Sequence, residues 1–148
     1  MGVEVEVDNA KLATKNNLNN NNVKILHCAI GSERGLVNIE NPEASKDSFR
    51  TNSNIIPGKD SIKMITISDI ESEFPEAIPF VVKIDIEGFE DSLFSKNTEW
   101  MSKFYLITLE IHDYMLPKKA ISKNFFREHS KDSRDCYLMG DMVFSIKN

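Results

Sequence analysis

The stretch Phe80–Glu90, F-V-V-K-I-D-I-E-G-F-E, decides the fold predicted for this chain. It opens as a nearly continuous run of aromatic and β-branched residues between Pro79 and Gly88, which predicts a strand buried on both faces. Strands of that kind are typical of parallel sheets covered by helices. Gly88 allows a sharp turn from the strand into a helix. The sequence therefore predicts an α/β fold organised around this strand.

Three carboxylates, Asp85, Glu87 and Glu90, lie at the carboxyl end of this predicted strand. In open α/β sheets, ligands bind outside the carboxyl ends of the strands, so this is where a site is expected. A purely structural role is the alternative. Glu87 and Glu90 stand near the start of the following helix, where negative charge complements the helix dipole.

Composition restricts the class of partner. The chain has 148 residues, enough for one domain, and a net charge of -5, so it offers no basic face for nucleic acid. It has no apolar segment near the roughly 20 residues that span a bilayer and no signal-peptide pattern at its N-terminus. We expect a cytoplasmic protein without a membrane partner. Cys28 and Cys136 lack metal-ligand spacing and are expected to be buried thiols.

Alternating and periodic patterns predict the elements before the Phe80 strand. Expected strands cover residues 3–7, 23–30, 36–39 and 63–67, and expected helices cover 8–18 and 68–74. Asp8 and Ser68 are the expected N-caps, with Glu71 completing a capping box after Ser68. Residues 41–60 are polar and without period, and predict a long loop. Such a loop is either a lid or substrate-binding segment, or a surface insertion.

After the Phe80 strand, the pattern ends in an antiparallel pair. Residues 105–111 predict a buried strand, and Pro117 is the expected start of a helix. Residues 136–147 alternate around Gly140-Asp141 and predict a hairpin.

Four stretches together resemble the FkbM-type methyltransferases, which use S-adenosylmethionine. The first is K-I-D-I-E-G-F-E at residues 83–90, followed by Leu93. Glu6-Val7-Asp8 resembles the family's E-P-D segment with valine in place of proline. Ala29-Ile30-Gly31 resembles its A-x-G segment, and Leu109-Glu110-Ile111-His112 resembles its E-x-H. The resemblance covers nearly the whole chain, as one domain over residues 1–148. It implies a class I, Rossmann-like methyltransferase sheet closed by a C-terminal antiparallel hairpin.

The resemblance also assigns cofactor contacts. It places Glu6 on the ribose hydroxyls of S-adenosylmethionine, since a carboxylate at a strand end can accept both hydroxyl protons. It places Ala29 and Gly31 near the adenine, and Asp85 near the transferred methyl group.

The same resemblance implies O-methylation of a hydroxyl on a small molecule or sugar, with Asp85, Glu87 and His112 as catalytic residues and no metal ligand. Asp85 or Glu87 would accept the hydroxyl proton. His112, beside Glu110, is a suitable base near neutral pH if a carboxylate orients its ring. The alternative for His112 is a structural histidine.

One part of the family pattern is missing from the chain. The family's first strand and its glycine-rich cofactor loop have no counterpart, because the chain starts at what resembles the second strand. We therefore expect an N-terminally truncated domain in which the second and fourth strands of the family sheet expose unpaired edges.

Two other functions are consistent with the residues. A metal-dependent hydrolase would use the Asp85, Glu87 and His112 cluster, because carboxylates suit magnesium or manganese. A non-catalytic fragment or interaction module would be completed by another chain that pairs with an exposed strand edge.

Overall fold

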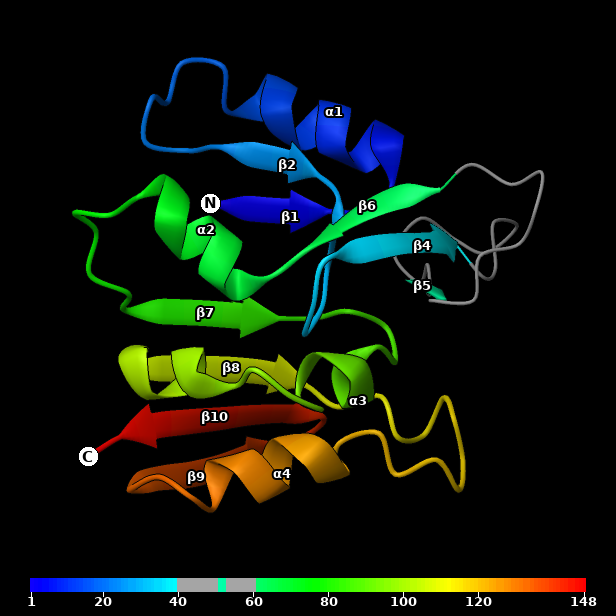
Figure 1. Cartoon of the computed structure of the whole chain (residues 1–148), viewed down its shortest axis with the longest axis vertical. Coiled ribbons are helices and arrows are strands. Elements are labelled where there is room, and N and C mark those ends of the chain that lie inside the picture. The colour runs from blue at the N-terminus through cyan, green and yellow to red at the C-terminus, as the bar shows by residue number, and fades with distance from the viewer. Residues whose placement is uncertain (40–50, 53–60) are drawn as a thin grey trace.

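The computed structural model describes residues 1–39, 51–52 and 61–148 (Figure 1). It is a mixed α/β structure that closes on a C-terminal antiparallel hairpin, as the sequence predicts. The predicted loop at residues 41–60 lies outside the described residues except for Thr51–Asn52, which form strand β5. In the described part of the chain, no helix has the length and apolar character needed to cross a membrane.

The first half of the chain contributes short strands and two helices. In order they are β1 (Gly2–Glu4), α1 (Val7–Asn16), β2 (Ile25–His27), β3 (Ala29–Ile30), β4 (Gly35–Ile39), β5, β6 (Ile62–Ile65) and α2 (Ile67–Glu73). The second half contains the longer strands. In order it has β7 (Val81–Ile84), α3 (Glu90–Leu93), the 3-10 helix η1 (Glu99–Lys103), β8 (Leu106–Glu110), α4 (Lys123–His129), β9 (Arg134–Met139) and β10 (Met142–Lys147).

The described strands form three sheets. The largest has the order β7-β8-β10-β9, in which β7 and β8 are parallel and the other pairs are antiparallel. The second has the order β3-β6-β4-β5, and β1 pairs in parallel with β2. Strands β1, β2, β7 and β8 run in the same direction, so their carboxyl ends lie on the same side of the molecule (Figure 1).

The prediction that the Phe80 strand is buried on both faces is wrong. Of this stretch, Ile84 is buried, whereas Phe80 and Val81 are 64% and 49% exposed. In the described residues β7 pairs with β8 alone and β1 pairs with β2 alone. A groove of about 490 Å³ lies between β1 and β7 and is lined by both. The apolar run therefore reaches the core at Ile84, and its free edge lines an open groove.

Three helical segments cover the β7-β8-β10-β9 sheet and form the main core with it. Trp100 of η1 and Phe125 of α4 are buried in one cluster with Leu109 of β8 and Val143 of β10. The rings of Phe94 and Phe125 meet edge to face with centroids 5.1 Å apart. This packing fixes the end of β8, where the candidate site begins.

Both helix N-caps predicted in the first half of the chain are wrong. Helix α1 is capped by Glu6, whose Oε2 accepts the N–H of Asn9 at 2.7 Å, rather than by Asp8. Helix α2 is capped by Thr66 with Asp69, two residues before the expected Ser68 and Glu71. Both caps, Glu6 and Thr66, keep extended backbone, as an N-cap residue must.

Two further predicted elements differ from the structure. The predicted strand at residues 23–30 is broken at Cys28 into β2 and β3, which pair with β1 and β6. The helix expected from Pro117 begins at Lys123, because the Asp113 carboxylate accepts the N–H of Ser122 at 3.3 Å and supports the start there. Cys28 is a buried thiol as expected, but Cys136 is exposed.

Arg134 connects the hairpin to the main core and has no counterpart among the predicted residues. Its guanidinium donates to Ser145 Oγ at 2.7 Å and to the carbonyls of Ser145, Phe104, Met101 and Tyr105 at 2.9, 2.9, 3.2 and 3.3 Å. The side chain is buried, and this burial lowers the pKa of the guanidinium. One side chain therefore satisfies the carbonyls at the end of η1 and the start of β8.

Arg134→Lys is expected to lower the free energy of unfolding by about 2 kcal/mol, since an ammonium group cannot reach the same set of acceptors. Urea denaturation measures the change. Arg127→Lys is the matched control, because Arg127 is 49% exposed and surface changes stay within about 0.5 kcal/mol. Equal losses in the two variants would contradict this role for Arg134.

Candidate functional site

The candidate site forms where β7 and β8 end side by side. The two strands are parallel, with Ile84 opposite Leu109. Asp85 follows β7 directly, and His112 stands two residues beyond the end of β8. Register and direction therefore bring Asp85 and Glu87 to the same edge of the sheet as His112, which lies far along the chain.

A tight turn after β7 directs Glu87 toward His112. Glu87 and Gly88 both have positive φ, 49° and 91°, and the Phe89 N–H closes the turn onto the Ile86 carbonyl at 3.1 Å. Positive φ is uncommon for a residue with a side chain, so Glu87 is held by its surroundings. A Cβ on Gly88 would come within 3.1 Å of Leu116 Cδ1. The turn therefore requires glycine both for its backbone and for its space.

A buried hydrogen bond orients the ring of His112. Its Nδ1 lies 2.6 Å from Glu90 Oε1, and each side chain is 1% exposed. The same Glu90 oxygen accepts the Gly88 N–H at 3.2 Å. Among the described residues, the buried Oε2 of Glu90 has no hydrogen-bond partner. Sequence reasoning gave Glu90 mainly a helix-dipole role and named Glu110 as the neighbour of His112, whereas Glu90 is the residue that holds the ring.

The other ring nitrogen of His112 faces three carboxylates. Nε2 lies 3.6 Å from Glu87 Oε2, 3.7 Å from Glu110 Oε1 and 3.8 Å from Asp85 Oδ1. These distances exceed hydrogen-bond length, so none of the three carboxylates is hydrogen-bonded to Nε2. Asp85 and Glu87 are 34% and 19% exposed, so a ligand can reach them from solvent.

Burial and neighbouring negative charges shift the pKa values of three groups in the site, Glu87, Glu110 and His112. Burial raises the pKa of Glu87, and nearby Asp85 and Glu110 raise it further while His112 opposes them. Burial likewise raises the pKa of Glu110, with Asp85 adding to the effect. For His112, burial disfavours the imidazolium, but the bond to Glu90 and the surrounding carboxylates leave its pKa raised. Lys83 balances part of the charge, with Nζ 2.9 Å from Asp85 Oδ2.

Of the residues that the resemblance assigns to the cofactor, Asp85 belongs to this cluster, whereas Glu6, Ala29 and Gly31 lie outside it. Glu6 follows β1 on the same side of the molecule, but it is 8% exposed and its carboxylate caps α1. Ala29 is buried in β3. Gly31 follows that strand, and a Cβ on it would overlap Met64 Sδ. Packing against Met64 is therefore sufficient to explain the glycine.

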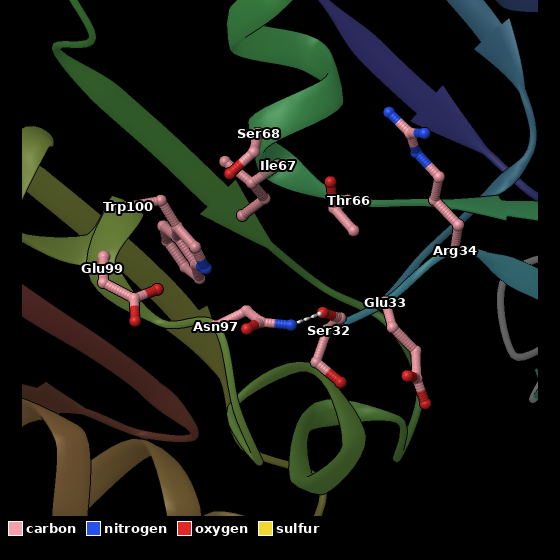
Figure 2. Close-up of a pocket in the computed structure, with 10 residues that line it drawn as sticks. Ser32, Glu33, Arg34, Thr66, Ile67, Ser68, Asn97, Glu99 and Trp100 are labelled. Carbon is pink, nitrogen blue, oxygen red and sulfur yellow. Dashed lines mark hydrogen bonds between the residues drawn. The ribbon is translucent and has the colours of Figure 1, made fainter.

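Gly31 and Asp85 line different cavities. Gly31 borders a cavity of about 530 Å³ that is also lined by Ser32, Thr66, Asn97 and Trp100 (Figure 2). The Asn97 amide donates to the Ser32 carbonyl at 2.8 Å, which ties together two walls of this cavity. Asp85 lines the groove between β1 and β7 instead. In the part of the chain that the structure describes, the assigned residues thus do not form one cradle for S-adenosylmethionine.

No protein-family model matches this sequence, and neither a curated protein nor a solved structure matches the chain. The functional proposal therefore rests on the geometry of the site and on the motif resemblance.

Gly88→Ala is expected to lower the free energy of unfolding by about 1–2 kcal/mol, because it strains the backbone at positive φ and crowds Leu116. Chemical denaturation measures this. Gly35→Ala is the control, since its Cβ would meet Met64 Cε at an ordinary 3.4 Å. A Gly88→Ala protein as stable as the control variant would show that the turn is not constrained as described.

Proposed function

We propose that the protein transfers a methyl group from S-adenosylmethionine to a hydroxyl of a small molecule or sugar, and that the hydroxyl loses its proton at the site formed by Asp85, Glu87 and His112. The observation that supports this is the oriented imidazole of His112 beneath two partly exposed carboxylates at the carboxyl ends of parallel strands. That edge is where ligands bind in open α/β sheets.

The chain's own residues supply proton acceptance and positioning. When bound, the cofactor supplies an electrophilic methyl group. Asp85 and Glu87 are exposed enough to receive a hydroxyl, and either carboxylate can accept its proton as the oxygen becomes nucleophilic. His112 lies below them, where it positions the carboxylates and balances their charge.

The support for the cofactor is the motif resemblance and the position of Glu6. This residue follows β1, whose carboxyl end lies on the same side of the molecule as those of β7 and β8 (Figure 1). Two observations do not favour cofactor binding. Glu6 caps helix α1, and Gly31 and Asp85 line separate cavities. Cofactor binding is therefore the part of the proposal to test first.

A metal-dependent hydrolase is the second candidate. One ligand atom from each of Asp85, Glu87 and His112 lies within 4.8 Å of the others, which suits a shared cation. Such an enzyme would need a metal ion and water but no S-adenosylmethionine.

Transfer of a radiolabelled methyl group to a panel of hydroxyl compounds tests the proposal. Glu87→Gln is expected to reduce the transfer rate at least about 100-fold, as expected for loss of a general base. Glu76→Gln, an exposed change outside the site, is expected to leave the rate unchanged. A chain whose thermal unfolding is indifferent to excess S-adenosylmethionine would contradict the proposal. Metal-dependent hydrolysis without the cofactor would favour the second candidate.

A further inference from the structure

We propose that Asp85, Glu87 and His112 bind one divalent transition-metal ion. Binding of the ion does not depend on the methyl-transfer proposal, because it follows from the arrangement of side chains at the ends of β7 and β8.

The three ligand atoms are close to the separations that a bound ion requires. His112 Nε2 lies 3.6 Å from Glu87 Oε2 and 3.8 Å from Asp85 Oδ1, and the three atoms lie within 4.8 Å of one another. Ligand atoms about 2.1 Å from a tetrahedral ion are about 3.4 Å apart. The two His112 separations are within about 0.4 Å of this value, and the separation of the two carboxylate oxygens would have to shorten by at most about 1.4 Å.

His112 is held in an orientation that suits a metal ligand. Its side chain is 1% exposed, and Nε2 faces the carboxylate oxygens of Glu87, Glu110 and Asp85 at 3.6, 3.7 and 3.8 Å. When an ion takes the place of the proton on Nε2, the remaining ring proton belongs on Nδ1, 2.6 Å from Glu90, and Nε2 presents its lone pair to the ion. A carboxylate that orients the second nitrogen is the usual support of a metal-binding histidine.

The charges around the site also favour a cation. Four carboxylates converge on the ring: Asp85 after β7, Glu87 in the turn, Glu90 of α3 and Glu110 of β8. Asp141, in the hairpin turn, adds to the negative field at Glu110. Lys83 binds the other oxygen of Asp85 and its side chain is 60% exposed, so water screens its charge. A divalent ion at Nε2 would offset the remaining repulsion.

The donor set indicates the class of ion. One imidazole with two or three carboxylates suits Mn²⁺, Fe²⁺ or Zn²⁺ better than Ca²⁺ or Mg²⁺, which prefer oxygen-only sites. Asp85 is 34% exposed, so the outer side of the site is open to a water or hydroxyl ligand. If the proposed function holds, the ion would bind the acceptor hydroxyl there and increase its acidity.

Titration with Mn²⁺, followed by the electron paramagnetic resonance signal of the free ion, tests the site without any cofactor. The wild-type chain is expected to bind one Mn²⁺ and to release it to Zn²⁺. Glu87→Gln is expected to weaken binding at least about 10-fold, and Glu76→Gln is expected to bind as the wild type does. Absence of binding at millimolar Mn²⁺, or equal binding by wild type and Glu87→Gln, would overturn the proposal.

Thermal unfolding of each variant checks that it is folded, and Asp85→Asn replaces Glu87→Gln if that variant is not. Lys83→Gln gives a second readout from a residue that is not a ligand. It removes the competing partner of Asp85, so we expect it to bind Mn²⁺ more tightly than the wild type. Weaker binding by a folded Lys83→Gln chain would count against the site. A chain that binds Mn²⁺ but transfers no methyl group would support the ion site while contradicting the proposed function.

Discussion

The candidate site depends on the buried hydrogen bond between Glu90 and His112. The pair is 22 residues apart in sequence and joins the first residue of α3 to the segment after β8 with a 2.6 Å contact. Both side chains are fully buried, where an unmet polar group is costly, so each requires the other. Because Glu90 Oε1 also accepts the Gly88 N–H, the same oxygen holds the turn that carries Glu87. The Glu90 carboxylate thus fixes the orientation of the His112 ring and the position of Glu87, which the ring faces.

Local sequence patterns predicted the C-terminal hairpin, the strand that begins at Phe80 and the strand at 105–111, which the structure has as β7 (Val81–Ile84) and β8 (Leu106–Glu110). Periodicity and turn residues carry that information. They do not show what covers a strand, and for this reason Val81 was expected to be buried and is half exposed. Cap positions failed by two residues. Residue preference favoured Asp8 for α1, whereas the structure uses Glu6, whose longer side chain accepts the Asn9 N–H.

The roles of Glu90 and Arg134 could not be predicted from the sequence, for a different reason. Each role is defined by a partner far along the chain. The partner of Glu90 is His112, after β8, and Arg134 binds carbonyls of η1 and of β10. A glutamate after a glycine at a helix start already has a sufficient local explanation in the helix dipole. Only the fold shows that its carboxylate turns inward, toward the ring of His112.

Methyl transfer and metal binding are proposed at the same edge of the sheet, and both depend on the orientation of His112. A proton NMR spectrum of the folded chain tests it most directly. A ring proton in a 2.6 Å bond between buried groups should give a slowly exchanging resonance well downfield of the backbone amides. Its absence in His112→Gln would assign it. A folded wild-type chain without that resonance would contradict the account, because Nδ1 would not be held by Glu90.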